Sequence, residues 1–198
     1  MKKDERFGEL LYQALETELG GVQVYEAAVG CAVNEDLKKE WQEYLDQTRN
    51  HVQIVENLLK ELGLDPNHET PGRQIVREKA ATLVKSMRSA KAAGDPSAAQ
   101  LVAAEAVVDA ETKDHQNWEL IGLLSQEMTG ETAQALKNAH AEVEEEEDEH
   151  LYHTMGWARE LWIEALGMAA VLPPPEEEKD VKTAIGAARA KLARKRML

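Results

Sequence analysis

A glutamate and a histidine, Glu147 and His150, are three residues apart in the acidic segment EEEEDEHL, residues 144–151. On a helix, this spacing places both side chains on one face, one turn apart. Carboxylate oxygen and imidazole nitrogen are ligands that suit iron, manganese and zinc. A helix that turns this face inward therefore supplies two ligands of a carboxylate–histidine metal site.

Three further ionisable residues, Glu18, His51 and Glu111, each interrupt a stripe of apolar residues that repeats with helical spacing. The stripes are Leu11, Leu15, Val22, Tyr25 and Val29; Leu37, Trp41, Leu45, Val52, Val55 and Leu62; and Leu101, Ala104, Val108 and Trp118. Stripes of this kind face a core, and buried carboxylates repel one another unless a cation neutralises them. We therefore predict a buried metal site formed by Glu18, His51, Glu111, Glu147 and His150.

Helices must position these residues, and the composition favours helices. Of the 198 residues, 43% are hydrophobic and only 5% are aromatic, while Ala, Glu and Leu, which favour helices, are abundant. Asn34 and Asp95 are predicted N-caps, and Gly63 and Gly94 are predicted to end helices. We expect five main helices, at residues 4–33, 35–62, 73–93, 96–128 and 131–166.

The connections between these helices predict how they pack. Short breaks join the first helix to the second and the fourth to the fifth, so each pair should form an antiparallel hairpin. Helix 73–93 lies in the crossover between the hairpins. We predict an all-α antiparallel four-helix bundle at residues 1–170, with an extra helix in the crossover. Residues 171–198 are expected to form a Pro-rich linker and a short basic C-terminal helix.

The two hairpins repeat one pattern of polar residues. Each supplies a Glu from its first helix, and the second helices carry Thr48-x-x-His51 and Glu147-x-x-His150 at corresponding places. This repetition indicates a pseudo-two-fold bundle around one central site.

Three segments carry a resemblance to a known family. They are LETELGGVQVY at residues 15–25, TRNHVQIVENLLKELGLDP at 48–66 and EEEEDEHL at 144–151. They resemble the ligand helices of the ferritin-like superfamily, in its bacterioferritin and rubrerythrin type of di-iron carboxylate bundle. The resemblance covers roughly residues 5–165. It implies a ferritin-like bundle with two iron ions or one, or alternatively manganese or zinc, and assembly as a homo-oligomer, expected to be a homodimer.

The sequence departs from this family pattern at Thr48. The family has a Glu there, which with its counterpart in the last helix usually bridges the two metals. A threonine hydroxyl supplies no negative charge, so we expect one metal position to bind more weakly than the other. His115, one turn after Glu111, is a residue that can compensate.

Two classes of function remain open. The first is an oxidoreductase or iron-handling protein, in which the metal reacts with oxygen or peroxide or is itself oxidised. The second is a non-catalytic structural or stress-related bundle with a degenerate or mononuclear metal site. Whether the chain is an enzyme is left open by the sequence.

Other polar residues of helix 131–166 have simpler interpretations. His140 and His153 are expected to be core histidines, and Glu144 borders the buried face. The remaining acidic residues of the run are expected to form a solvated helix face: Glu142, Glu145, Glu146, Asp148 and Glu149.

Charge and hydropathy limit the binding partners and the cellular location that we expect. The net charge of −14 argues against binding to nucleic acid. The chain shows no apolar run long enough to span a membrane and no signal-peptide pattern, and its single cysteine, Cys31, cannot form an internal disulfide. We therefore expect a cytoplasmic protein. The basic tail, with Val181, Ile185, Ala188 and Leu192 on one face, is expected to dock on an acidic surface.

Overall fold

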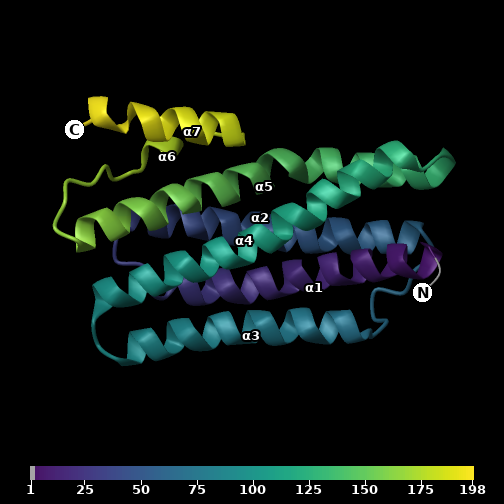
Figure 1. Ribbon diagram of the computed structural model, residues 1–198. Helices are drawn as coiled ribbons and strands as arrows, with labels where there is room; N and C mark the ends of the chain where they lie inside the picture. The colour runs from purple at the N-terminus through teal and green to yellow at the C-terminus, as the bar shows by residue number, and fades with distance from the viewer. Residues whose placement is uncertain (1–2) are drawn as a thin grey trace.

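A computed structural model describes the backbone of residues 3–198 and the side chains of residues 6–198 (Figure 1). All of the regular secondary structure in this range is helical, which confirms the all-α prediction. The elements are α1 (Lys3–Val29), α2 (Glu35–Glu61), α3 (Pro71–Ala92), α4 (Pro96–Glu127), α5 (Gly130–Ala165), α6 (Pro175–Glu178), α7 (Ala184–Ala193) and the 3-10 helix η1 (Arg194–Arg196).

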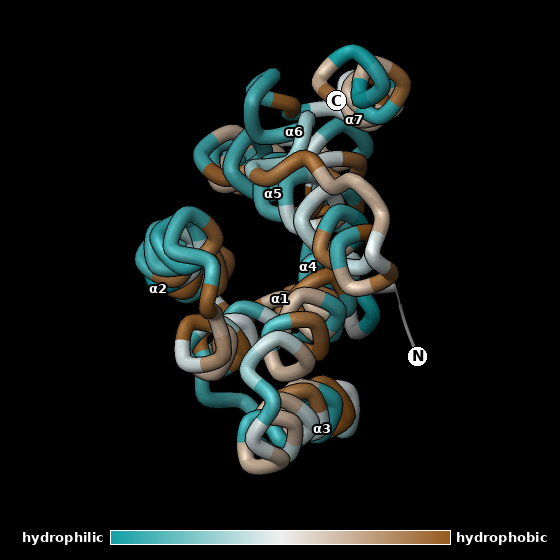
Figure 2. Tube along the Cα trace, turned by 90° about the vertical axis from the view of Figure 1, so that its left-hand side faces the viewer, coloured by the Kyte–Doolittle hydropathy of each residue, from teal (hydrophilic) through white to brown (hydrophobic). Residues whose placement is uncertain are grey.

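Four long helices surround a common interior. α1 packs against α2 and α4, and α5 packs against the same two helices. Neighbours in this ring run in opposite directions (Figure 1), and the view along the bundle shows α3 outside the ring, against α1 and α4 (Figure 2). α6 and α7 lie on the outer side of α5. The two helical hairpins and the helix in the crossover are therefore present as expected.

Local capping explains most helix boundaries. The side-chain oxygen of Asn34 accepts hydrogen bonds from the first turn of α2, and Asp95 does the same for α4. Gly63 and Gly94 follow helix ends with positive φ angles of 71° and 87°, a conformation that glycine adopts at little cost. These ends agree with the predicted ones to within one or two residues.

The end of α1 is an exception. The helix was expected to reach residue 33 but ends at Val29. The backbone amides of Val33 and Asn34 instead donate hydrogen bonds of 2.7 Å to the Oε1 atom of Gln100 on α4. A side chain distant in the sequence therefore satisfies the backbone of this loop and stops the helix.

The interior has two apolar halves with a polar layer between them. One half includes Tyr25, Trp41 and Met87, and the other includes Leu15, Trp118 and Leu136. The layer between them contains buried ionisable side chains from all four helices of the ring: Glu18, His51, Glu111, Asp114, Glu147 and His150. The polar side chains are therefore enclosed by apolar packing on both sides along the bundle axis.

A buried ion-pair network attaches α3 to the outside of the ring. The Glu16 carboxylate accepts from Arg73 Nε at 2.9 Å and from Arg77 Nε at 2.8 Å, and both Glu16 and Arg73 are 4% exposed. Gly20 allows close approach of α1 and α3, because a Cβ atom there would lie 2.7 Å from the Cβ of Ala80. α3 therefore packs closely against the side of α1 that faces away from the interior of the ring.

The tail docks on α5 of its own chain, and most of the predicted apolar face stays exposed. Ile185 and Leu192 are 66% and 81% exposed. Val181, from the same predicted face, is buried, and Arg194 Nε donates to the buried Glu160 carboxylate at 2.8 Å. The predicted face is therefore wrong for the three residues within α7, where the ion pair of Arg194 with Glu160 holds the helix against α5.

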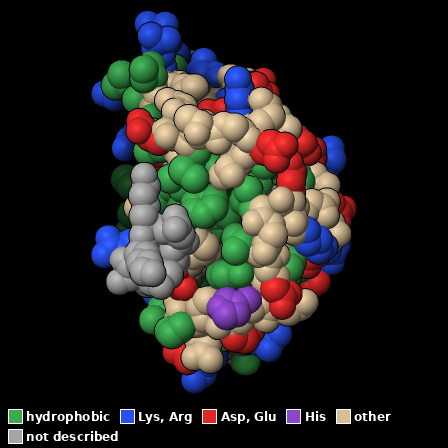
Figure 3. Space-filling model, turned by 90° about the vertical axis from the view of Figure 1, so that its right-hand side faces the viewer, with side chains coloured by type: hydrophobic (Ala, Val, Ile, Leu, Met, Phe, Trp, Pro, Cys, Tyr) green, Lys and Arg blue, Asp and Glu red, His purple; other side chains and the backbone are tan. Residues whose placement is uncertain are grey.

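Two surface features complete the fold. In the described part of the chain, no helix is long and apolar enough to cross a membrane. Hydrophobic side chains are exposed at the end of the bundle where α1 begins (Figure 3), and Phe7, Leu10, Leu123 and Met128 line a groove in this region.

Candidate metal centre

The structure brings all five predicted ligand residues into one buried cluster. Glu18 comes from α1, His51 from α2, Glu111 from α4, and Glu147 and His150 from α5. None of these residues is more than 3% exposed. Each helix of the ring therefore contributes at least one carboxylate or imidazole to the polar layer.

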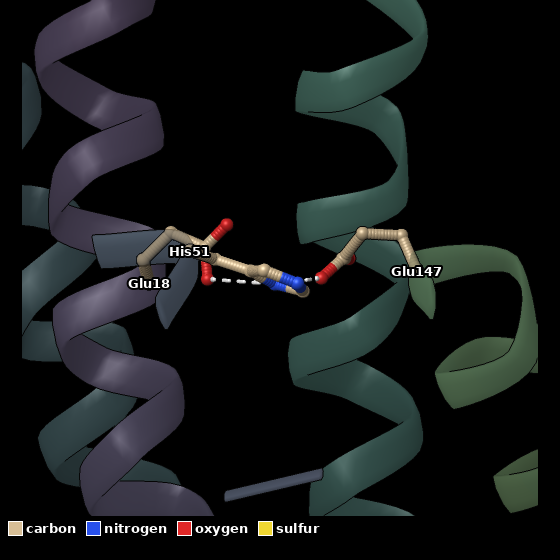
Figure 4. A group of neighbouring side chains, drawn as sticks. All are labelled: Glu18, His51 and Glu147. Atoms are coloured by element: carbon tan, nitrogen blue, oxygen red, sulfur yellow. Dashed lines mark ion pairs between the residues drawn. The ribbon is translucent and has the colours of Figure 1, made fainter. Parts of the chain in front are cut away.

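Glu18, His51 and Glu147 form the first of two groups with metal-site geometry, in which one donor atom from each residue lies within 4.8 Å of the others. His51 Nδ1 is 2.9 Å from Glu147 Oε1 and 3.7 Å from Glu18 Oε2. Figure 4 shows the imidazole between the two carboxylates. Trp118 Nε1 donates to Glu18 Oε1 at 2.8 Å, which leaves Oε2 on the side of His51.

The second group consists of Glu111, Glu147 and His150 and meets the same limit. His150 Nδ1 lies 3.7 Å from Glu111 Oε2 and 3.7 Å from Glu147 Oε1. The Glu147 carboxylate belongs to both groups, and the two imidazole rings stack with centroids 5.7 Å apart. Glu147 is therefore placed to bridge two neighbouring ions.

The outer nitrogen of each histidine is held by the opposite hairpin. His51 Nε2 is 2.7 Å from Glu146 Oε2 on α5, and His150 Nε2 is 2.8 Å from Gln47 Oε1 on α2. A proton on Nε2 would donate to both oxygens, and Nδ1 of each ring lies toward the carboxylates of the cluster. Partners of this kind fix the tautomer and the ring orientation of histidines that bind metals.

Five side-chain nitrogen and oxygen atoms of the predicted ligands have no hydrogen-bond partner among the described residues. These atoms are Glu18 Oε2, His51 Nδ1, Glu111 Oε2, Glu147 Oε2 and His150 Nδ1. Buried polar atoms are normally paired, and each unpaired one is costly. Their chemistry is that of a first-row transition-metal site, so the residues present fit a pair of such ions.

Burial and mutual repulsion raise the pKa values of carboxyl groups in the cluster. Burial, together with the nearby charge of Glu111, raises the pKa of Glu147 to about 8. Burial raises the pKa of Glu18 well above its usual value, and the charges of Asp114 and Glu147 add to this effect. Without a cation, the cluster therefore holds protons near neutral pH, and a bound cation must displace them.

Three residues around the cluster were not predicted. Asp114 on α4 is 4% exposed and faces the cluster. Glu146 was assigned to the solvated face, but its carboxylate holds His51, and Gln47 was not singled out. The i, i+3 spacing of Glu111 and Asp114, the same as that of Glu147 and His150, is the one signal that could have identified Asp114.

The other histidines lie outside both groups. His115 does not compensate for Thr48, because it is partly exposed and its Nε2 lies 2.8 Å from Asp148 Oδ1. That hydrogen bond raises the pKa of His115. His153 is a buried core histidine, as predicted, next to the Tyr44 hydroxyl. His140 is instead partly exposed, and Glu144 is exposed.

A pocket connects the surface with one side of the cluster. Its volume is about 340 Å³, and its lining includes Glu147 and Trp118 at the cluster and His115, His140 and Tyr152 nearer the surface. Thr183 and Ala184, at the start of α7, form part of its wall. Small molecules and ions can therefore approach Glu147 between α4 and α5.

Comparison with protein families, with curated proteins and with solved structures gives no match to the chain. The function must therefore be argued from the geometry of the site.

Proposed function

We propose that the chain is a ferritin-like protein with a dinuclear carboxylate–histidine metal site, which binds iron or manganese and acts in oxygen or peroxide chemistry or in iron handling. The observation that carries the proposal is the pair of three-residue groups that share Glu147. Their unpaired donor atoms all lie in one buried layer. The segments that resemble ferritin-like ligand helices support the same assignment.

The residues of the site would hold the ions and control their surroundings. Glu18, His51 and Glu147 would hold one ion, and Glu111, Glu147 and His150 the other. The bound metals would supply the electron transfer that the side chains lack. Trp118 orients Glu18, and the apolar halves of the core keep water away on both sides.

Access to the cluster limits the reaction partner. The pocket next to Glu147 has room for a small molecule or an ion and is lined by His115, Glu119 and Asp148. Dioxygen, peroxide or a free ferrous ion fit this size and polarity. Burial and the charge of Glu111 raise the pKa of Tyr25, so this phenol stays protonated beside the site. Cytoplasmic location and assembly as a homodimer remain predictions.

Metal content and reaction with air test the proposal. Protein purified without chelators is analysed for metals, and the apoprotein is titrated with Fe(II) without oxygen and then exposed to air. We expect up to two ions per chain and an air-dependent rise in near-ultraviolet absorbance. Both should be lost in Glu147→Gln and kept in Glu142→Gln, since Glu142 is exposed on the same helix.

Two outcomes would change the assignment. A wild-type chain that binds no iron and no manganese would overturn the proposed site. Tight binding with no change on exposure to air or peroxide would replace the oxidative function with a structural role for the metal.

A further inference from the structure

Thr48 does not supply a ligand to the cluster, although it is only 2% exposed. Its hydroxyl donates to the backbone carbonyl of Tyr44 at 2.8 Å, one turn earlier in α2. Its methyl group packs against α1, where a Cβ atom on Gly21 would lie 3.2 Å away. α2 therefore gives the site one imidazole and no anionic oxygen.

Asp114 places an additional carboxylate on the opposite helix. It lies on α4, one turn after Glu111, so both side chains share a helix face. The residue is 4% exposed, and its Oδ1 atom has no hydrogen-bond partner among the described residues. Burial raises the pKa of Asp114, and the charges of Glu147 and Glu111 raise it further, while His51 and Glu18 lower it, as expected for a carboxyl group next to the cluster.

Four buried carboxylates thus lie in one layer of the described structure without an ion pair to a basic side chain. Among the described residues, no Lys or Arg forms an ion pair with any of the four: Glu18, Glu111, Asp114 and Glu147. Such contacts between buried acids are strongly unfavourable unless a cation lies between them. Asp114 is outside the two three-residue groups. After burial, its charge is the largest cause of the raised pKa of Glu18, which belongs to the group that contains His51.

We propose that Asp114 is a ligand of the divalent transition-metal ion held by Glu18, His51 and Glu147, and that it replaces the carboxylate that position 48 lacks. This inference rests on the proposed function. It gives the site four carboxylates and two imidazoles, and four negative charges balance two divalent ions. The missing carboxylate is thus supplied by α4 instead of α2, and the position that contains His51 gains a fourth protein ligand.

The test compares metal binding in variants of the full-length apoprotein. Mn(II) is titrated by calorimetry without oxygen, and electron paramagnetic resonance reports whether two bound ions are magnetically coupled. We expect two coupled ions for the wild type. Asp114→Asn should keep one ion, at the group containing Glu111 and His150, and weaken the other by at least about tenfold. Asp109→Asn, an exposed aspartate on α4, is the matched control.

A rescue variant keeps the test independent of folding effects. Thr48→Glu combined with Asp114→Asn moves the carboxylate back to α2 and should restore the second ion and the coupling. Circular dichroism of each apoprotein shows that the variants are folded. Two equal ions in Asp114→Asn, or a single ion in the wild type, would overturn the role of Asp114 while leaving a metal site in place. No ion in the wild type would overturn the proposed function itself.

Discussion

Replacing Glu147 by Gln should stabilise the apoprotein although it destroys the proposed site. Glu147 is 2% exposed and lies among Glu18, Glu111 and Asp114. Glutamine has nearly the same shape but stays neutral at every pH. The variant therefore removes the cost of placing a titratable acid in this layer and leaves the packing almost unchanged.

The pKa of Glu147 gives the size of the effect. The value is about 8 in the folded chain against 4.5 for an unperturbed group. Between these values the unfolded chain binds fewer protons than the folded chain, so stability falls as the pH rises. The folded wild type therefore keeps its full stability below pH 4.5 and loses stability as the pH rises through about 8. The raised pKa lowers the free energy of unfolding of the wild type by about 1 kcal/mol at pH 5 and by about 3 kcal/mol at pH 7.

Urea unfolding of chelator-treated protein measures this cost. We expect Glu147→Gln to be more stable than the wild type by about 3 kcal/mol at pH 7 and by about 1 kcal/mol at pH 5. Saturating Mn(II) should reverse the order at pH 7, since each site filled at a hundred times its Kd adds about 2.7 kcal/mol to the wild type alone. Glu142→Gln should follow the wild type throughout. A Gln variant that is less stable than the wild-type apoprotein at both pH values would refute the reasoning.

Three further perturbations test other parts of the structure. Glu146→Gln should weaken Mn(II) binding by about tenfold, because the outer nitrogen of His51 loses its charged partner; unchanged affinity in a calorimetric titration would show that Glu146 does not support His51. Arg194→Ala should lower the free energy of unfolding by about 1–3 kcal/mol and expose residues 171–198 to protease, because the buried Glu160 loses a partner. Arg189→Ala, at an exposed position, should leave the digestion pattern unchanged. Gly20→Ala should lower the unfolding free energy by about 1–3 kcal/mol, because its Cβ atom would lie 2.7 Å from that of Ala80; equal loss in Gly8→Ala, where the nearest atom would be 3.8 Å away, would argue against this close approach.

The parts of the fold that depend on local sequence were predicted well. Asn34, Asp95 and the glycines act within one helical turn, so the boundaries that they set could be inferred from neighbouring residues. The end of α1 depends on Gln100, which is more than sixty residues away, and no local pattern indicates it. The docking of α7 on α5 depends in the same way on a contact between Arg194 and Glu160.

Helical periodicity identified the five residues of the two groups but not the other polar side chains next to the cluster. After Glu111, both residue 114 and residue 115 fit the spacing of an inward face, since three and four residues each make about one turn. Packing decides between them, and it buries Asp114 while His115 lies at the pocket. Glu146 was missed for a related reason: its role is set by the position of His51 on another helix.

The crossed hydrogen bonds give the two hairpins a shared role in building the site. His51 belongs to the α1–α2 hairpin but is oriented by Glu146 of α5, and His150 of α5 is oriented by Gln47 of α2. Glu147 completes both groups from one hairpin, while Glu18 and Glu111 come from different ones. Neither hairpin alone can therefore present two oriented histidines together with the carboxylate that both groups share. Docking brings four acids together at a free-energy cost that bound cations would remove, so metal affinity and hairpin packing should rise and fall together.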